Sequence, residues 1–335
     1  MNASTKMFLD QIVSDMNLLK KKMIWEMDSY AMATLSAFLF AGAGKKADVE
    51  RYIECKKYFK KTVNVFSEMR GISETIVITK MCLADDYEAF LAGVTEVYKR
   101  LRKIHKFIAS PYMVMTAVNI YEAGGLELAD KNIENLESVY KSMKAEHFWL
   151  TGDEDRPFLA MMVSRDIDVA AVSAEISACY EASKKMSLSK EAMHTASQIM
   201  SLSSKSVDAK VTDLKITIDT LKEHKIRGMK SELMPMAAAL GLVEGSAEAK
   251  AIAIKENYDY LKKQKGFKWY IGSTQRSLYA ILAYAIENLD SDKTALNSVI
   301  STTLTNIIME EIIMLMIITS TSNSIRTSST GTSAN

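Results

Sequence analysis

The feature that most constrains the fold is an internal period of about forty residues. Seven segments begin alike, with an aromatic residue or leucine followed by basic residues, and successive segments start 40 to 42 residues apart. Each segment crosses a short turn into an apolar, alanine-containing stretch. The segments are LLKKKM, YFKKTV, YKRLRK, YKSMKA, YEASKK, LKEHKI and LKKQKG, which start at Leu18, Tyr58, Tyr98, Tyr140, Tyr180, Leu221 and Leu261. A period of this length is typical of helix–turn–helix units that stack along the chain.

Composition agrees with an all-helical fold. The 335 residues include only three prolines, and Ala, Leu, Met, Lys and Glu, which favour helices, are abundant. Because one helix pair cannot bury its own apolar stripe, each unit must complete its core against its neighbours. We therefore predict an all-α protein, an α-solenoid-like or compact array of about seven two-helix repeats that forms a single domain over residues 1–319. Ser110 before Pro111, Ser189 and Ser273 are expected to cap second helices.

Charge and cysteine usage indicate a cytoplasmic protein. Forty-two basic and 41 acidic side chains leave a net charge of +1, so no global field draws the chain to nucleic acid or anionic lipid. Cys55, Cys82 and Cys179 are far apart in the sequence, which favours free thiols in a reducing compartment. The apolar run from Ala31 to Gly44 is shorter than the ~20 residues that a membrane span needs. No secretory signal is evident, and we predict no cofactor.

The stretch YKSMKAEHFWLTGDEDRP, residues 140–157, concentrates residues that can carry chemistry. It could be a ligand-binding or acid–base site made of His147, Trp149, Thr151, Asp153, Asp155 and Arg156. The favoured interpretation is a structural corner in which Asp153 or Asp155 caps the second helix, because that cap would leave Pro157 in the first turn, where proline is tolerated. His105 holds the same position one unit earlier, in a turn without acids, which favours the structural interpretation.

No metal site or catalytic set is predicted from the remaining histidines. His194 and His224 belong to other units and show no ligand spacing with His147. Cys179 lies on a predicted helix with no histidine near it in sequence, so we expect a buried apolar side chain.

A family resemblance rests on this same region. HFWLTGDEDRPFLAMMV, with Tyr140 before it and HTASQIM (His194 to Met200) after it, resembles domain-of-unknown-function family 4003 of bacterial, mainly Firmicutes, proteins. The resemblance spans Leu18 to Leu289. It implies an all-helical cytoplasmic protein and draws attention to the turn from Leu150 to Asp155, but it brings no established activity and no catalytic residues.

Charges are segregated between the two kinds of turn. Acidic residues collect at the connections between units, whereas the ends of the first helices are basic. This predicts a basic edge that contains Lys99, Arg100, Arg102, Lys103, Lys106, Lys225, Arg227, Lys262 and Lys263. Compensation of helix dipoles explains much of the pattern. An acidic peptide or RNA along the basic edge is the alternative, although few aromatics interleave with the bases, so nucleic acid is the less favoured partner.

The C-terminal region differs from the repeats. Residues 304–319 form the most apolar segment, but Glu310 and Glu311 interrupt it and argue against a membrane span. We predict a capping helix over residues 296–319 that packs into the core or mediates self-association. Residues 320–335 form a polar tail of low complexity that we expect to be disordered.

The sequence leaves three functions open. The favoured one is a non-catalytic scaffold that binds an unknown protein or acidic peptide, inferred from architecture alone. The second is an enzyme or small-ligand-binding protein that uses the corner from His147 to Asp155. The third is a peripheral membrane protein that docks through Leu304 to Thr319. Convergent polar groups in a concave site would favour the second function, and a long open groove would favour the first.

Overall fold

The computed structural model describes residues 1–22, 29–65, 67–105, 110–163, 168–187, 189–228, 233–268 and 270–289. Within these ranges the chain forms fourteen α-helices, one 3₁₀ helix and no strand, which confirms the predicted all-α class. Lys106, the predicted capping helix (296–319), the apolar segment from Leu304 to Thr319 and the tail (320–335) lie outside the described residues.

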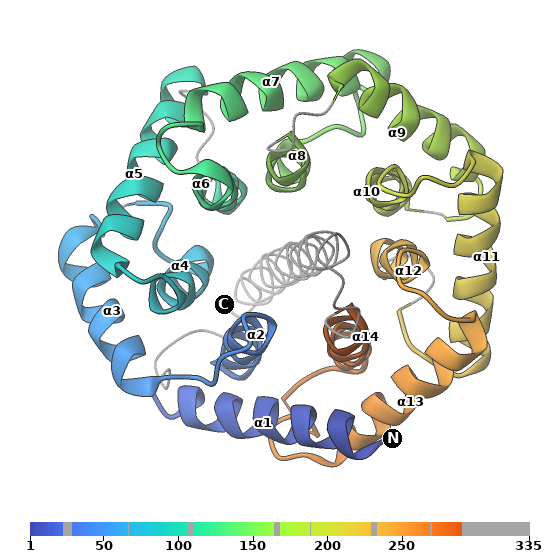
Figure 1. The fold of residues 1–335 in the computed structure, drawn as a ribbon, viewed down its shortest axis with the longest axis horizontal. Coiled ribbons are helices and arrows are strands. Elements are labelled where there is room, and N and C mark those ends of the chain that lie inside the picture. The colour runs from blue at the N-terminus through green and yellow to red at the C-terminus, as the bar shows by residue number, and fades with distance from the viewer. Residues whose placement is uncertain are drawn as a thin grey trace, which may run out of the picture.

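The helices alternate between two concentric rings (Figure 1). The outer ring contains α1 (Ala3–Lys20), α3 (Val49–Thr62), α5 (Tyr87–Ile104), α7 (Ala129–Glu146), α9 (Val169–Ser183), α11 (Val207–Glu223) and α13 (Ala247–Lys263). The inner ring contains α2 (Ser29–Gly42), α4 (Ile72–Leu83), α6 (Pro111–Gly124), α8 (Arg156–Val163), α10 (Lys190–Met200), α12 (Met234–Gly241) and α14 (Ser273–Leu289). The seven residues that start the sequence segments all lie in the last two turns of outer helices.

The two rings bury different patterns of side chains. Outer helix α5 is amphipathic and buries Phe90, Leu91, Val94, Val97 and Leu101, which share one face at helical spacing. Inner helix α6 buries every residue from Met113 to Ile120, because neighbouring helices surround it. The outer helices therefore form the boundary between the core and solvent, and the inner helices are core on most sides.

The ring closes where the first and last helices meet. The Tyr279 hydroxyl of α14 donates to the Ala31 carbonyl of α2 at 3.2 Å, and the Tyr279 ring stacks on Phe38 at 5.2 Å. Thr5 of α1 donates to Glu287 of α14 at 2.7 Å. The first and last helices thus meet, and the helices form a closed ring (Figure 1). A narrow inner ring needs small side chains at its contacts, and alanine-rich inner helices such as α12 (MPMAAALG) supply them.

Two of the three predicted helix caps are confirmed. Ser110 accepts the backbone N–H of Met113 at the start of α6, and Ser189 accepts that of Ala192 at the start of α10. Ser273 is predicted to cap α14 but is its first helical residue, so this prediction is wrong by one position. Across the described ranges, no helix is long and apolar enough to cross a membrane.

Candidate functional site

The corner between α7 and α8 is built by a tight turn and a short 3₁₀ helix. His147 caps the C-terminus of α7, and its carbonyl accepts the backbone N–H of Thr151 at 3.0 Å. The 3₁₀ helix η1 (Asp153–Asp155) comes next, and the Asp155 carboxylate reaches back to accept the Gly152 N–H at 2.9 Å. Because α8 begins at Arg156, Pro157 lies in its first turn, as predicted.

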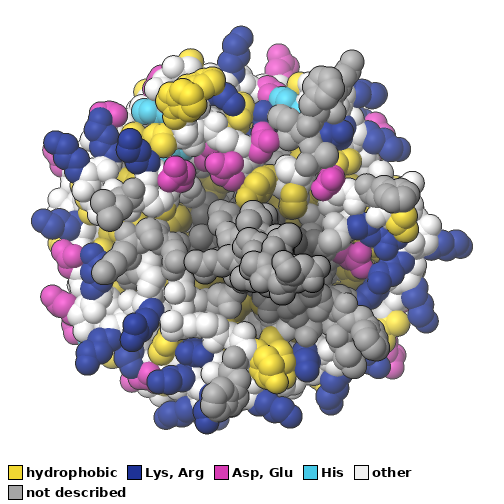
Figure 2. Space-filling model, turned by 180° about the vertical axis from the view of Figure 1, so that it is seen from behind, with side chains coloured by type: hydrophobic (Ala, Val, Ile, Leu, Met, Phe, Trp, Pro, Cys, Tyr) yellow, Lys and Arg dark blue, Asp and Glu magenta, His cyan; other side chains and the backbone are white. Residues whose placement is uncertain are grey.

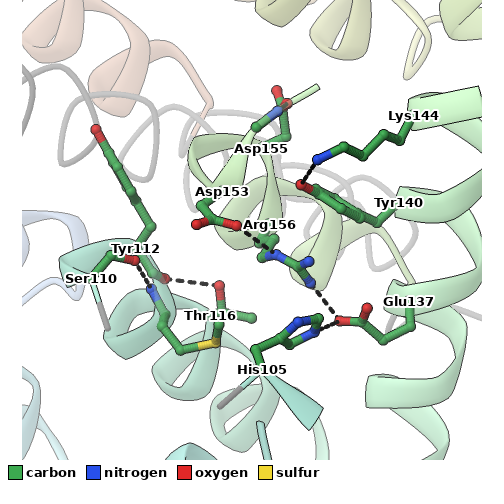
Figure 3. Close-up of polar contacts among 12 residues, drawn as sticks. His105, Ser110, Tyr112, Thr116, Glu137, Tyr140, Lys144, Asp153, Asp155 and Arg156 are labelled. Atoms are coloured by element: carbon green, nitrogen blue, oxygen red, sulfur yellow. Dashed lines mark hydrogen bonds and ion pairs between the residues drawn. The ribbon is translucent and has the colours of Figure 1, made fainter. Parts of the chain in front are cut away.

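Arg156 is the centre of one polar group at this corner (Figure 3). Its side chain is only 2% exposed and pairs with Glu137 of α7 at 2.5 Å and with Asp153 at 3.2 Å. The guanidinium lies 3.8 Å from the centre of the Tyr140 ring. Glu137 also contacts His105 Nε2 at 2.9 Å. Arg156 at the start of α8 is therefore linked through Glu137 of α7 to His105 at the end of α5. The carboxylates of Glu137 and Asp153 compensate the buried charge of Arg156.

A second group surrounds the Asp155 carboxylate, which is buried. Gln198 Nε2 donates to Asp155 Oδ1 at 2.5 Å, and His194 Nδ1 lies 3.6 Å from the same oxygen. Of the buried side-chain atoms without a hydrogen-bond partner in the described part of the chain, three belong to this corner and to α10: Thr151 Oγ1, His194 Nε2 and Gln198 Oε1. Native proteins leave few buried polar atoms unpaired, so three on adjoining residues require an explanation.

Aromatic rings enclose this second group on the side of α9. The rings of His147, Tyr180 and His194 pack edge to face, with centroids 5.1 to 5.8 Å apart. His147 Nε2 also lies 3.0 Å from Ser177 Oγ. Burial lowers the pKa of His147, and the neighbouring His194 lowers it further. Burial likewise raises the pKa of Tyr180. Both shifts favour the neutral forms, so the enclosure around His194 is uncharged on this side.

The 3₁₀ helix presents acids next to the buried group. Burial raises the pKa of Glu154, and the adjacent Asp155 and Asp153 raise it further. Burial is also the main cause that raises the pKa of Tyr112 in α6, with Glu154 and Asp153 adding to it. On the face of the ring in Figure 2, one group of acidic side chains lies toward the centre, and basic side chains, with further acids among them, follow the rim. A carboxyl group that holds its proton more tightly than usual can donate a hydrogen bond to a bound molecule.

The structure buries three of the six predicted site residues and pairs a fourth with one of them. Thr151, Asp155 and Arg156 are buried, and Asp153 pairs with Arg156. His147 lies at the edge of the cluster, within van der Waals reach of Tyr180 and His194. Trp149 is 90% exposed and packs only on Phe148 among the rings described, so it lies outside the buried group.

Sequence reasoning missed residues on other helices. The sequence places His194 in another unit without metal-ligand spacing to His147, and it does not foresee that His194 Nδ1 lies 3.6 Å from Asp155. Gln198 appears only within the stretch HTASQIM that carries the family resemblance, and Glu137 is not singled out by any sequence pattern. A signal did exist: His194 and Gln198 are four residues apart on α10 and so share one face, which turns toward Asp155 in η1.

Other predicted features have simpler placements. Over the described ranges, no group of three or more His, Cys, Asp or Glu side chains could hold a metal ion. In the basic edge, Arg100 pairs with Glu96 at 3.3 Å and with Asp130 at 3.1 Å, so part of its charge is compensated locally. The exposed members are Lys99, Lys103, Lys225, Arg227, Lys262 and Lys263.

Comparisons with known proteins give a family but no activity. One family model, described as a protein of unknown function, matches residues 16–315. No curated protein and no solved structure matches the chain.

Proposed function

Because the chain belongs to the DUF4003 family, whose function is unknown, we propose a function from its own residues: the α7–α8 corner binds a small polar ligand. The observation that carries this proposal is the set of three unpartnered, buried polar atoms on Thr151, His194 and Gln198, the last two of which lie next to Asp155. An unpaired buried polar group destabilises a protein by about 1–3 kcal/mol, and a bound ligand would form the missing hydrogen bonds with these atoms.

The atoms available define the class of ligand. The Gln198 amide nitrogen lies 3.3 Å from His194 Nδ1 and can donate to it, and in that arrangement Nε2 is left as a donor. His194 Nε2 then offers a donor, Gln198 Oε1 an acceptor, and Thr151 a hydroxyl that can do both. Asp155 and Glu154 disfavour an anion. The site therefore suits a neutral compound with hydroxyl or amide groups.

The scaffold role predicted from architecture depended on an open groove along stacked units. It remains a prediction without a supporting contact, and it ranks below ligand binding because the first and last helices meet. We retain from it the proposal that each outer helix and the inner helix after it form one of seven equivalent units. The shared position of Tyr58, Tyr98, Tyr140 and Tyr180 near the ends of outer helices supports this unit.

Thr151→Val tests the ligand site directly. The substitution keeps the shape of the side chain but removes an unpartnered hydroxyl, so the unliganded protein should keep or slightly raise its melting temperature. A panel of neutral monosaccharides, inositols and small amides is screened by thermal shift. We expect at least one compound that raises the melting temperature of the natural chain and not that of the variant.

Thr79→Val is the matched control. Thr79 is buried in α4 and bonds to the Thr75 carbonyl at 2.7 Å and to Ser36 at 2.9 Å, so its loss should lower stability and leave the response to the compound intact. A panel in which no compound acts, or an active compound that acts equally on Thr151→Val, would show that water or nothing occupies these atoms.

A further inference from the structure

The seven turns that lead from outer to inner helices share one face of the ring. Each inner helix starts at this face, because every unit repeats the same order of outer helix, turn and inner helix (Figure 1). The last turns of the outer helices supply lysine and arginine there, and Figure 2 shows these side chains following the rim. Exposed examples are Lys60, Lys61, Lys99, Lys103, Lys222, Lys262 and Lys263.

Exposed apolar side chains gather at the same turns. Val65, Ile104, Phe148, Trp149 and Tyr270 are each more than half exposed, and they belong to four different outer-to-inner turns or to the helix end just before one. Only two other large apolar side chains among the described residues reach that exposure, and both lie within helices α1 and α11. Large apolar groups in water are unfavourable, so their concentration on one face indicates a surface that is covered.

The opposite face has the reverse character. Its turns lead from inner to outer helices and carry acidic caps, namely Asp48, Asp86 and Asp168. The large apolar side chains that reach solvent in its turns, Leu126 and Leu128, are each less than half exposed. The ring is therefore polarised: basic and apolar side chains follow the rim of one face, whose centre also carries acids, and aspartate caps occupy the turns of the opposite, acidic face.

We propose that the basic, apolar face docks onto an anionic lipid bilayer, with the axis of the ring along the membrane normal. Exposed apolar side chains interleaved with lysine and arginine suit the surface of such a membrane. The apolar side chains would enter the interfacial region, and the basic side chains would contact the anionic lipid headgroups. Trp149 and Tyr270 are the residue types that favour this interface, and the acidic face points to bulk water.

Two other anionic partners fit the surface less well. Single-stranded RNA could stack on Phe148, Trp149 and Tyr270, but stacking gives no role to the exposed aliphatic side chains of Val65 and Ile104, which a bilayer would take up. An acidic peptide needs a continuous groove, whereas the exposed apolar residues are distributed over turns around the ring. A flat bilayer is the partner that contacts all of these turns at once.

Co-sedimentation of the full chain with vesicles tests the proposal. We expect binding to phosphatidylglycerol–phosphatidylcholine vesicles, weaker binding at high salt and little binding to phosphatidylcholine alone. The double variant Phe148→Ser/Trp149→Ser should weaken binding at least about tenfold, because the apolar side chains no longer enter the bilayer. Lys262→Glu/Lys263→Glu, on the other side of the ring, should weaken it several-fold.

Controls on the acidic face keep the test specific. Leu126→Ser and Lys46→Glu change the same residue types in inner-to-outer turns and should leave vesicle binding unchanged. Circular dichroism verifies that all variants fold. The proposal fails if the chain ignores anionic vesicles, if both double variants bind as the natural chain does, or if a homopolymeric RNA binds in place of vesicles.

Discussion

Two corners of the ring begin alike and end differently. His105 caps α5 and His147 caps α7, and each N–H donates to a carbonyl four residues earlier. Each imidazole then reaches the next outer helix, where His105 lies 2.9 Å from Glu137 and His147 lies 3.0 Å from Ser177. His224 repeats the arrangement after α11, at 2.9 Å from Glu248. The histidine is thus a recurring link between outer helices.

The difference between these corners lies in the residues that come after the histidine. The α5–α6 corner enters its inner helix through Ser110 and Pro111, a cap that needs no buried charge. The α7–α8 corner inserts a 3₁₀ helix, a buried arginine and a buried aspartate. The comparison teaches that the distinctive chemistry belongs to Asp155, Arg156 and the residues of α10, and that His147 alone does not mark a site.

Arg156→Ala should produce the largest difference between the two corners. It removes both ion pairs and the stacking on Tyr140, and it leaves Glu137 with His105 as its remaining partner here. We expect the free energy of unfolding to fall by about 3–5 kcal/mol in urea denaturation. Lys103→Ala, which removes an exposed cation at the end of α5, should change it by less than about 0.5 kcal/mol. Equal effects at both positions would remove the distinction.

Asp155→Asn should have the next largest effect. The amide keeps the volume of the side chain but loses the charge that strengthens its bonds from Gly152 N–H and Gln198. We expect the free energy of unfolding to fall by about 1.5–3 kcal/mol. Asp86→Asn is the matched control. Asp86 is the N-cap of α5, and asparagine is as good an N-cap residue as aspartate, so this substitution should have little effect. A stability loss confined to Asp86→Asn would contradict the role given to Asp155.

The features that could be predicted from the sequence are those that depend on local contacts. Residues a few positions apart determine the helix class, the Ser110 cap and the place of Pro157, so these features can be predicted from local sequence. Closure of the ring depends on small angles added at each unit, and no single residue encodes them. The meeting of His194 with Asp155 depends on how two inner helices turn toward one another, which helical spacing restricts but does not determine.

Ser110→Ala tests the simpler corner by itself. The substitution removes the oxygen that accepts the Met113 N–H, and the free energy of unfolding should fall by about 1 kcal/mol. Ser110→Gly should lower it by only a few tenths of a kcal/mol, because glycine is a fair cap. If both variants match the loss from Asp155→Asn, the two corners depend on their polar groups equally.

The smallest effect is a pH dependence that separates the two histidine caps. His105 faces the carboxylate of Glu137, whereas His147 faces the Ser177 hydroxyl and the His194 ring. Burial and His194 lower the pKa of folded His147, and Glu146 and Glu181 only partly oppose them. As pH falls through about 6.5, the unfolded chain therefore binds a proton that the folded chain does not, and the free energy of unfolding decreases. His147→Gln removes this contribution, so the variant should lose less stability than the natural chain between pH 8 and pH 5. An NMR titration in which the His147 imidazole has a midpoint above 6.5 would reverse the sign of the dependence and place His147 in the same charge environment as an ion-paired cap.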